Sequence, residues 1–216
     1  MTIVSPHIEK FLRENPGMAL APSRTSDTVL AGEFSFKRTY RGENEIAETY
    51  ELRISIGHNF PKDPPVIEET GQRIKRIGDY HVNPDGSLCL GSPIRLRMLL
   101  AKAPTLSAFV ESCLVPYLYA VTYKMRHGGK LIFGELDHGD KGEIQDYEEL
   151  FGLKGKEAVL SALKALGTKK RISNKKPCPC GCGIRLGKCK THFTLNQFRP
   201  MVSRSYFRKC HQSLKT

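Results

Sequence analysis

The sequence predicts an α+β domain followed by a small, basic, cysteine-rich tail. Residues 45–57 alternate apolar and polar side chains, the period of a half-buried antiparallel strand. Residues 106–121 place apolar side chains three and four apart, the pattern of an amphipathic helix. Four of the seven cysteines fall between residues 178 and 189. With 216 residues, 39% of them hydrophobic, the chain is long enough for one domain and an appendage.

The net charge of +12 is unevenly distributed along the chain. Residues 168–216 contain 13 Lys and Arg and no Asp or Glu, whereas residues 1–167 hold 21 basic and 22 acidic residues. We therefore expect two domains, 1–167 and 168–216. A segment as basic as the second one either binds an acidic partner, such as nucleic acid or an acidic protein face, or is a solubilising tail.

The first domain is expected to run from a helix through antiparallel strands to further helices. The expected elements are a helix at 5–14, strands at 28–41, 45–57 and 66–68, an irregular segment at 78–93, a long helix from 106, a loop at 131–140, and helices at 142–151 and 156–166. Pro116 should kink or split the long helix, and Cys113 lies on its apolar stripe as a core residue. Gly167 is predicted as a C-cap, and residues 168–176 are predicted as a linker.

Neither a membrane span nor a secretory signal is expected. No uninterrupted apolar run approaches the roughly 18 residues that a span requires. The first six residues lack the basic-then-apolar pattern of a signal peptide. We therefore expect a cytoplasmic protein with no membrane partner.

Two motifs resemble those of the ubiquitin-conjugating enzymes. Phe60-Pro61 with Pro64-Pro65 is similar to the family's proline-rich turn after the third strand, and the stretch Asp85-Gly86-Ser87-Leu88-Cys89-Leu90 is similar to its active-site sequence. The resemblance covers roughly residues 5–165. It implies an antiparallel sheet flanked by helices, with Cys89 as the nucleophile of an acyl transferase.

The residues before the cysteine depart from the eukaryotic pattern. Eukaryotic members place a His-Pro-Asn with its Asn eight residues upstream of the cysteine, where this chain has His81, and Asn83 lies six residues upstream. The form Tyr80-His81-Val82-Asn83-Pro84 is more similar to bacterial relatives from antiphage operons that also encode a nucleotidyltransferase of the cyclic GMP-AMP synthase type. The resemblance implies that the C-terminus of such a nucleotidyltransferase, or of a ubiquitin-like protein, is the group conjugated.

Cys89 has the chemistry that such a reaction needs. A thiolate attacks the acyl carbon, and the thioester stays reactive toward the next nucleophile. A donor must stabilise the oxyanion, and His81 or Asn83 is a candidate, as are backbone N–H groups near Cys89. Asn83 could instead hold the turn of the loop. The alternatives are a buried Cys89 between two leucines and a scaffold without catalytic activity. Asp137 and His138, in an acidic loop, are weaker candidates for orienting an amine.

The cysteine cluster predicts a structural zinc site. The Cys-x-Cys-x8-Cys spacing of Cys178, Cys180 and Cys189 resembles the small zinc module of the bacterial translocation ATPase. In that module a Cys or His directly after the third cysteine is the fourth ligand. Here Lys190 occupies that position, so we expect His192 as the fourth ligand, with Cys182, Cys210 and His211 as alternatives. A disulfide or reduced thiols are the competing interpretations.

Aromatic residues alternate with arginines near the end of the chain. They are Phe193, Phe198, Tyr206 and Phe207 among Arg199, Arg204 and Arg208. This pattern is found where bases stack and phosphates bind, so nucleic acid is an alternative partner of the tail. The same aromatic residues could instead pack the tail against the rest of the protein.

Overall fold

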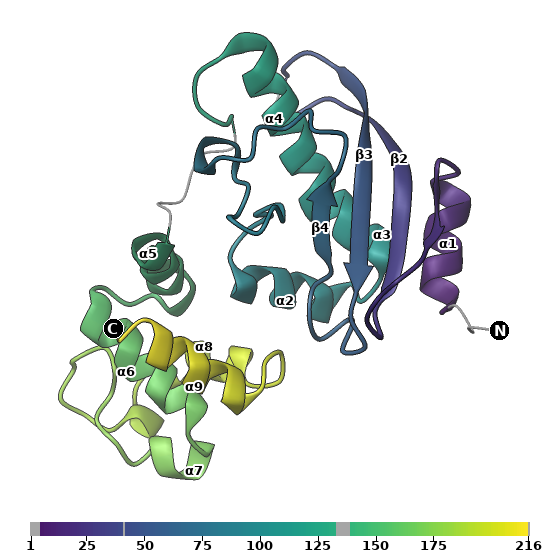
Figure 1. Cartoon of the computed structure of the whole chain (residues 1–216). Coiled ribbons are helices and arrows are strands. Elements are labelled where there is room, and N and C mark those ends of the chain that lie inside the picture. The colour runs from purple at the N-terminus through teal and green to yellow at the C-terminus, as the bar shows by residue number, and fades with distance from the viewer. Residues whose placement is uncertain (1–4, 41, 133–138, 216) are drawn as a thin grey trace. The chain divides into compact units, whose positions relative to one another are not determined.

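A four-stranded antiparallel sheet with the strand order β1-β2-β3-β4 is the centre of the N-terminal part of the chain (Figure 1). The computed structural model describes residues 5–40, 42–132 and 139–215. The chain divides into two compact units, residues 1–135 and residues 136–216. The predicted α+β class with an antiparallel sheet is confirmed.

Unit 1 contains the sheet, and unit 2 is helical. The elements of unit 1 are α1 (Pro6–Glu14), β1 (Met18–Ala21), β2 (Thr28–Arg38), β3 (Ile46–Ile56), β4 (Val66–Glu69), the 3-10 turn η1 (Gly78–Tyr80), α2 (Pro93–Lys102), α3 (Leu106–Phe109), the π turn η2 (Val110–Leu114) and α4 (Val115–His127). Those of unit 2 are α5 (Gly139–Phe151), α6 (Lys156–Gly167), α7 (Lys170–Ser173), the 3-10 turn η3 (Leu186–Lys188), α8 (Thr191–Phe198) and α9 (Arg204–Ser213).

The period-2 pattern of β3 is seen directly in its burial. Tyr50, Leu52 and Ile54 are completely buried, whereas the residues between them are more exposed. β3 pairs with β2 along its whole length, from Thr28 opposite Ile56 to the other end of both strands. One face of the sheet therefore carries the core of unit 1.

Strand β1 was not predicted, because Met-Ala-Leu-Ala favours helix by propensity. Its pairing with β2 depends on two glycines. Gly32 has a φ of +137°, and a Cβ there would lie 2.2 Å from the carbonyl oxygen of Gly17. A Cβ on Gly17 would lie 2.4 Å from the oxygen of Glu33. The close approach of the two backbones allows this short strand to join the sheet.

The long helix changes its winding just before Pro116, where a kink or a split was predicted. It runs without interruption from Leu106 to His127, and the π turn η2 joins α3 to α4 and ends two residues before the proline. Pro116 has no N–H to continue the α-helical pattern, and the wider turn absorbs that loss. The helical stretch Leu106–His127 has the length and composition of a membrane span, but 67% of its most apolar window is buried inside the protein. Cys113 lies in the core, as predicted.

Helix α2 was not predicted. Its ends are nevertheless marked in the sequence, since Pro93 occupies its first turn and Pro104 follows directly after its C-cap residue, Ala103. The helix buries Ile94 and Leu100, and its Arg97 forms an ion pair of 2.8 Å with Asp63.

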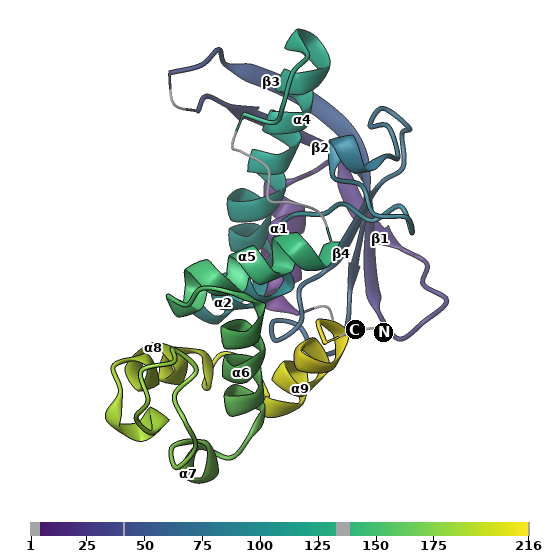
Figure 2. The same ribbon diagram turned by 90° about the vertical axis from the view of Figure 1, so that its left-hand side faces the viewer.

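Unit 2 has a helical core of its own, and Figure 2 shows α6 and α9 side by side within it. Two arginines fix the C-terminal end of α6: Arg199 donates to the carbonyl oxygens of Ala165 and Thr168 at 2.9 and 3.0 Å, and Arg208 donates to that of Gly167 at 3.2 Å. A cation is favoured at a helix C-terminus. Gly167 is the last helical residue rather than a C-cap, and a Cβ there would lie 2.8 Å from Arg208.

The compact units divide the chain earlier than the expected boundary between residues 167 and 168. Helices α5 and α6 pack with the C-terminal helices, so the basic segment shares a core with them. The expected linker at 168–176 contains α7, whose buried Ser173 accepts a hydrogen bond of 3.0 Å from Arg199. The sequence becomes strongly basic at residue 168, but the helices on both sides of that residue share one core.

Candidate functional site

Cys89 ends a small hairpin, residues 81–89, which we call the Cys89 hairpin. The backbone N–H of Cys89 donates to the carbonyl of His81 at 2.7 Å, and Val82 bridges Leu88. The N–H of Leu88 donates to Ile67 of β4 at 2.8 Å, which attaches the hairpin to the sheet. The backbone of Cys89 is therefore bonded directly to that of His81 at the open end of the hairpin.

Helix α4 holds the segment that leads into the hairpin. The hydroxyl of Tyr117 donates to the carbonyl of Tyr80 at 2.7 Å, and the ammonium of Lys124 donates to that of Asp79 at 2.7 Å. Tyr117 and Lys124 are seven residues apart, so they lie on one face of α4 two turns apart. Together with the bond from Cys89 to His81, the carbonyls of three successive residues, 79 to 81, each accept a hydrogen bond of 2.7 Å.

This anchoring explains the backbone of His81. Its φ of 51° and ψ of 46° lie in the left-handed region, which is uncommon for a residue with a side chain. Such a conformation persists only where surrounding contacts impose it, and it is often found at functional sites. Burial raises the pKa of Tyr117, with a further contribution from the nearby Cys89, so the Tyr117 hydroxyl stays a neutral donor.

The thiol of Cys89 is half-buried. Its neighbours Leu88 and Leu90 pack into or against the core of unit 1, and this anchors the chain on both sides of the cysteine. Cys113 is different, because it is buried in the core and burial raises the pKa of its thiol to about 11. Of these two cysteines, Cys89 is the more exposed residue.

Asn83 has a role in the turn of the hairpin. Its side-chain amide donates to the hydroxyl of Ser87 at 3.0 Å, and the carboxylate of Asp85 accepts from both the amide and the hydroxyl of Ser87 at 2.9 and 2.6 Å. The hydrogen bonds from Ser87 lower the pKa of Asp85. The side chains of the turn therefore hold it by hydrogen bonds to one another. His81 is the residue bonded to Cys89, and Asn83 lies two residues farther along, toward the turn.

The structure thus pairs His81 with Cys89 and uses Asn83 in the turn. The backbone N–H groups of Cys89 and Leu88 are already donated to other carbonyls. Tyr117 and Lys124 were not identified from the sequence, because no local motif links α4 to residues 79 and 80. Asp137 and His138 lie outside the described residues.

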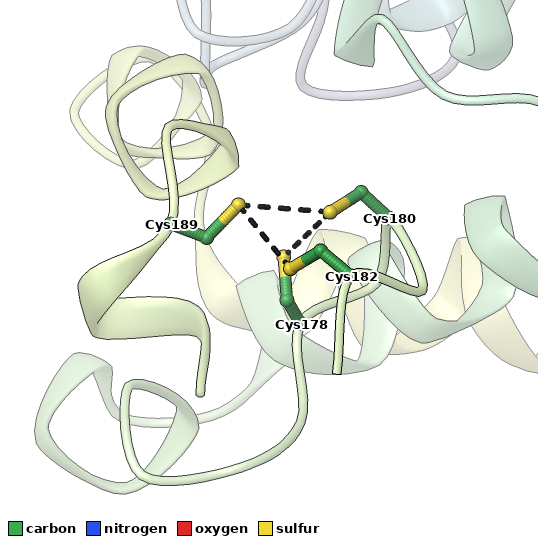
Figure 3. A group of neighbouring side chains, drawn as sticks. All are labelled: Cys178, Cys180, Cys182 and Cys189. Carbon is green, nitrogen blue, oxygen red and sulfur yellow. Dashed lines mark hydrogen bonds between the residues drawn. The ribbon is translucent and has the colours of Figure 1, made fainter. Parts of the chain in front are cut away.

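The second candidate site is the four-cysteine cluster, formed by Cys178, Cys180, Cys182 and Cys189. Figure 3 shows their side chains converging on one point. All four sulfur atoms lie within 4.8 Å of one another, and the nearest pairs are 3.2, 3.6 and 3.7 Å apart. These separations exceed the roughly 2.05 Å of a disulfide. The group could hold a metal ion, because four thiolates around a tetrahedral ion with bonds of about 2.3 Å lie about 3.8 Å apart.

A tight backbone loop brings the four thiols together. The N–H of Cys178 donates to Ile184 at 2.9 Å, and that of Leu186 donates to Lys176 at 2.9 Å, so the two arms of the loop pair. Between them Gly181 and Gly183 have φ values of 74° and 77°, a conformation that glycine adopts at low cost. The turn η3 then returns the chain to Cys189.

The surroundings of two of these thiols favour opposite protonation states. Hydrogen bonds from the hydroxyl and then the backbone amide of Thr191 lower the pKa of Cys189 to about 6. Burial raises the pKa of Cys178 to about 12. A cation among the four sulfurs would be needed to keep the buried one as a thiolate near neutral pH.

The expected fourth ligand, His192, is not part of this group, and Cys182 takes its place. The Nε2 atom of His192 lies 2.8 Å from the amide nitrogen of Asn196 and 3.2 Å from that of Asn174, so the ring is fixed by two amides. Cys210 and His211 lie on α9 and are not part of the group either. Cys182 reaches the cluster because the glycines on either side of it reverse the chain.

Two of the four aromatic residues near the end of the chain are structural, and Tyr206 is half-buried. Phe198 and Phe207 are buried in the core of unit 2, and Phe198 packs edge-on against Phe151 of α5 with ring centroids 5.1 Å apart. Phe193 is the exception, since 72% of it is exposed. The alternation of aromatic and basic residues is therefore mainly a packing pattern.

Comparison of the chain with protein-family models, curated proteins and solved structures gives no match. The Cys89 hairpin and the four-cysteine cluster are therefore interpreted from their own residues and geometry.

Proposed function

We propose that this chain is a ubiquitin-conjugating-like acyl transferase that carries its substrate as a thioester on Cys89. The observation that carries this proposal is the Cys89 hairpin, in which a half-buried thiol is held opposite His81 by bonds to backbone atoms. A nucleophile needs a fixed backbone and an accessible sulfur, and this arrangement provides both.

The order of the elements supports the same proposal. Helix α1, the sheet β1 to β4, the segment with Cys89 and the later helices follow one another in the order that the resemblance implies. The Pro-rich turn, residues 60–65, directly precedes β4, to which the Cys89 hairpin is attached. The two motifs shared with ubiquitin-conjugating enzymes thus flank one strand.

In the proposed reaction, the Cys89 thiolate attacks the carbonyl carbon of a donor that arrives as an acyl adenylate or as a thioester of another protein. The tetrahedral intermediate expels AMP or the other thiolate, and the acyl group remains on Cys89. His81 is proposed to donate a hydrogen bond to the oxyanion. An amine then attacks the thioester, loses a proton and releases the Cys89 thiolate as the amide forms.

For the donor we propose the C-terminal carboxyl group of a nucleotidyltransferase of the cyclic GMP-AMP synthase type, with a role in antiviral defence. A ubiquitin-like protein would present the same chemical group. This assignment rests on the resemblance of residues 80–90 to the bacterial relatives.

The test is intact-mass measurement of the chain co-expressed with the genes that flank its own. We expect an added mass equal to a donor protein minus water, and its loss after treatment with hydroxylamine, which cleaves thioesters. An adduct that resists hydroxylamine, or that persists when Cys89 is replaced, would contradict the thioester. A half-buried cysteine that never acquires an adduct would favour a non-catalytic scaffold.

We also propose that the four-cysteine cluster binds one structural Zn²⁺. Four thiol donors at tetrahedral separations suit zinc, and a site closed by four protein ligands is structural rather than catalytic. The ion would hold the loop from Cys178 to Cys189, which has few apolar residues of its own. Elemental analysis of the purified protein should find one zinc per chain.

A further inference from the structure

The segment that contains the four-cysteine cluster is also the most basic part of the molecule. Residues 169–190, which we call the basic lobe, contain eight Lys and Arg and no acidic residue. All eight are exposed: Lys169, Lys170, Arg171, Lys175, Lys176, Arg185, Lys188 and Lys190.

These charges differ from those of unit 1, where basic side chains pair with carboxylates. Arg73 and Arg126 both bind Glu48, and Arg97 binds Asp63 at 2.8 Å. Within the described part of the chain, no ion pair involves a basic residue of the basic lobe. Unit 1 thus neutralises much of its own charge, and the basic lobe does not.

The cations of the basic lobe are not required for packing either. Farther along the chain, Arg199 and Arg208 act on the C-terminal end of α6 and are structural. Ser173 of the basic lobe accepts a hydrogen bond from Arg199, but none of the eight cations takes part in that cap. A bound Zn²⁺ with four thiolates would have a net charge of about −2, which eight cations exceed.

The paired arms of the loop gather these cations on one scaffold. Pro177 bridges Arg185, and the N–H of Leu186 donates to Lys176 at 2.9 Å, so Lys175 and Lys176 on one arm lie across from the residues that directly follow Arg185 on the other. The side chain of Phe193 follows shortly after on α8 and is the most exposed of the large apolar residues that the structure describes, at 72%.

We infer that the basic lobe binds single-stranded nucleic acid, with its cations on the phosphates and Phe193 stacked on a base. A cationic surface beside an exposed aromatic ring is the arrangement that binds single strands without sequence preference. An acidic protein face would satisfy the charges but would leave the Phe193 ring without an aromatic partner. The inference goes beyond the proposed acyl transfer and does not depend on it.

The probe is a fluorescein-labelled oligothymidylate of about 20 nucleotides, longer than the 4–16 nucleotides that small single-strand sites cover. Its fluorescence anisotropy is measured with the full zinc-loaded chain over a range of salt concentrations. If four to six phosphates are neutralised, the slope of log affinity against log salt should be about −3 to −4.

The decisive variant is K175E/K176E/R185E, which should weaken binding by more than about tenfold. The matched control, R13E/K62E/K102E, makes the same change in net charge at exposed residues of unit 1 and should keep most of the affinity. Zinc content and circular dichroism establish that each variant is folded, and the neutral K175Q/K176Q/R185Q provides a second variant if the first is not. Phe193→Ala should weaken binding to the single strand by about tenfold and to a duplex much less.

Several outcomes would overturn the inference. They are absence of binding at low salt, equal losses in the two charge-reversal variants, an unchanged affinity in Phe193→Ala, and displacement by polyglutamate as effective as that by unlabelled oligonucleotide. The last result would identify an acidic protein as the partner. Cys89→Ala should bind the oligonucleotide normally, so this test can fail independently of the thioester.

Discussion

The Cys89 hairpin and the four-cysteine cluster use cysteine in opposite ways. At Cys89 the backbone is held by hydrogen bonds to His81 and, through Leu88, to β4, while the residue is only half-buried. In the four-cysteine cluster the sulfurs converge within 4.8 Å, and the backbone turns at glycines with positive φ. A nucleophilic cysteine needs a reactive thiolate that the substrate can reach, on a backbone held in place. A metal-binding cysteine needs a sulfur in a fixed position, and the backbone must turn tightly to bring several such sulfurs together.

The two sites also differ in what stabilises them. The Cys89 hairpin is supported by the core of unit 1, because Val82 and Leu88 are buried in it. The loop of the four-cysteine cluster buries Cys178, Pro179 and Leu186 but is otherwise largely exposed. We therefore expect the first site to tolerate loss of its cysteine and the second to depend on it.

The largest effect should come from replacing Cys89. In Cys89→Ala the hydroxylamine-sensitive adduct should disappear completely, with little change in thermal stability, because the thiol is half-buried and its backbone bonds remain. Cys113→Ala is the matched control. It should lower stability by about 1 kcal/mol by leaving a small cavity, and it should keep the adduct. Loss of the adduct in Cys113→Ala instead would reverse the two assignments.

The next effect concerns the metal. Cys178→Ser and Cys182→Ser should each lose zinc in elemental analysis, whereas His192→Ala should retain it, because His192 lies on the amides of Asn174 and Asn196. Chelation should unfold the loop from Cys178 to Cys189 and leave the thermal transition of unit 1 unchanged. Zinc retained in Cys182→Ser but lost in His192→Ala would restore the ligand set expected from the sequence.

The contrast between Cys182 and His192 shows what the spacing of residues in the sequence cannot predict. Spacing alone identified three of the four cysteines of the four-cysteine cluster. It did not identify the fourth, because that choice depends on how Gly181 and Gly183 reverse the chain around Cys182. The side chain of His192 is taken by two asparagines, one of which lies 18 residues earlier. Only the folded chain brings these groups together.

The fold shows the same division. Strands β2 and β3 followed from local periodicity, and the irregular winding of the long helix before Pro116 followed from proline geometry. Strand β1 did not, because its residues favour helix and its place in the sheet depends on the contact of Gly17 with Gly32. Packing across the chain overrode local propensity there, as it did when α6 joined the basic segment in unit 2.

His81 should have a smaller effect than Cys89. His81→Ala should slow acyl transfer by about 100-fold if its side chain donates to the oxyanion. Asn83→Ala should slow it much less, since the amide of Asn83 is used by Ser87. The measurement is the single-turnover rate of thioester discharge to an amine. A larger loss in Asn83→Ala would show that the turn, rather than His81, controls the reaction.

A smaller effect is expected where α4 holds the hairpin. Tyr117→Phe removes the hydrogen bond to the carbonyl of Tyr80 and should cost about 1 kcal/mol of stability. It should also slow discharge by about tenfold, because a shift of about 1 Å in the segment of His81 disturbs the alignment.

Helix α4 supplies a matched control for this effect. The hydroxyl of Tyr119 donates to the carbonyl of Asn44 at the same 2.7 Å, away from the Cys89 hairpin. Tyr119→Phe should therefore cost similar stability in urea unfolding and leave the discharge rate unchanged. If both variants slowed discharge equally, Tyr117 would contribute to the stability of the fold and would have no specific role in positioning His81.

The smallest effect should come from the turn of the hairpin and should depend on pH. Hydrogen bonds from Ser87 lower the pKa of Asp85 in the folded protein from its ordinary value of 3.8. A carboxylate with a lowered folded pKa stabilises the fold above the unfolded pKa, and this stabilisation is lost as the pH falls through the folded pKa. Because Asp85 is exposed, the stabilisation should be small, and its dependence on pH should be confined to values below about 4.

Asp85→Asn should therefore lower stability slightly near neutral pH, where the carboxylate is ionised, and should flatten the acid limb of the stability curve. Hydrogen exchange at the amide of Ser87, which donates to Asp85, should report the same loss locally. A Ser87 amide equally protected in Asp85→Asn and in the unaltered chain at neutral pH would show that the backbone pairing of the Cys89 hairpin holds the turn without the carboxylate.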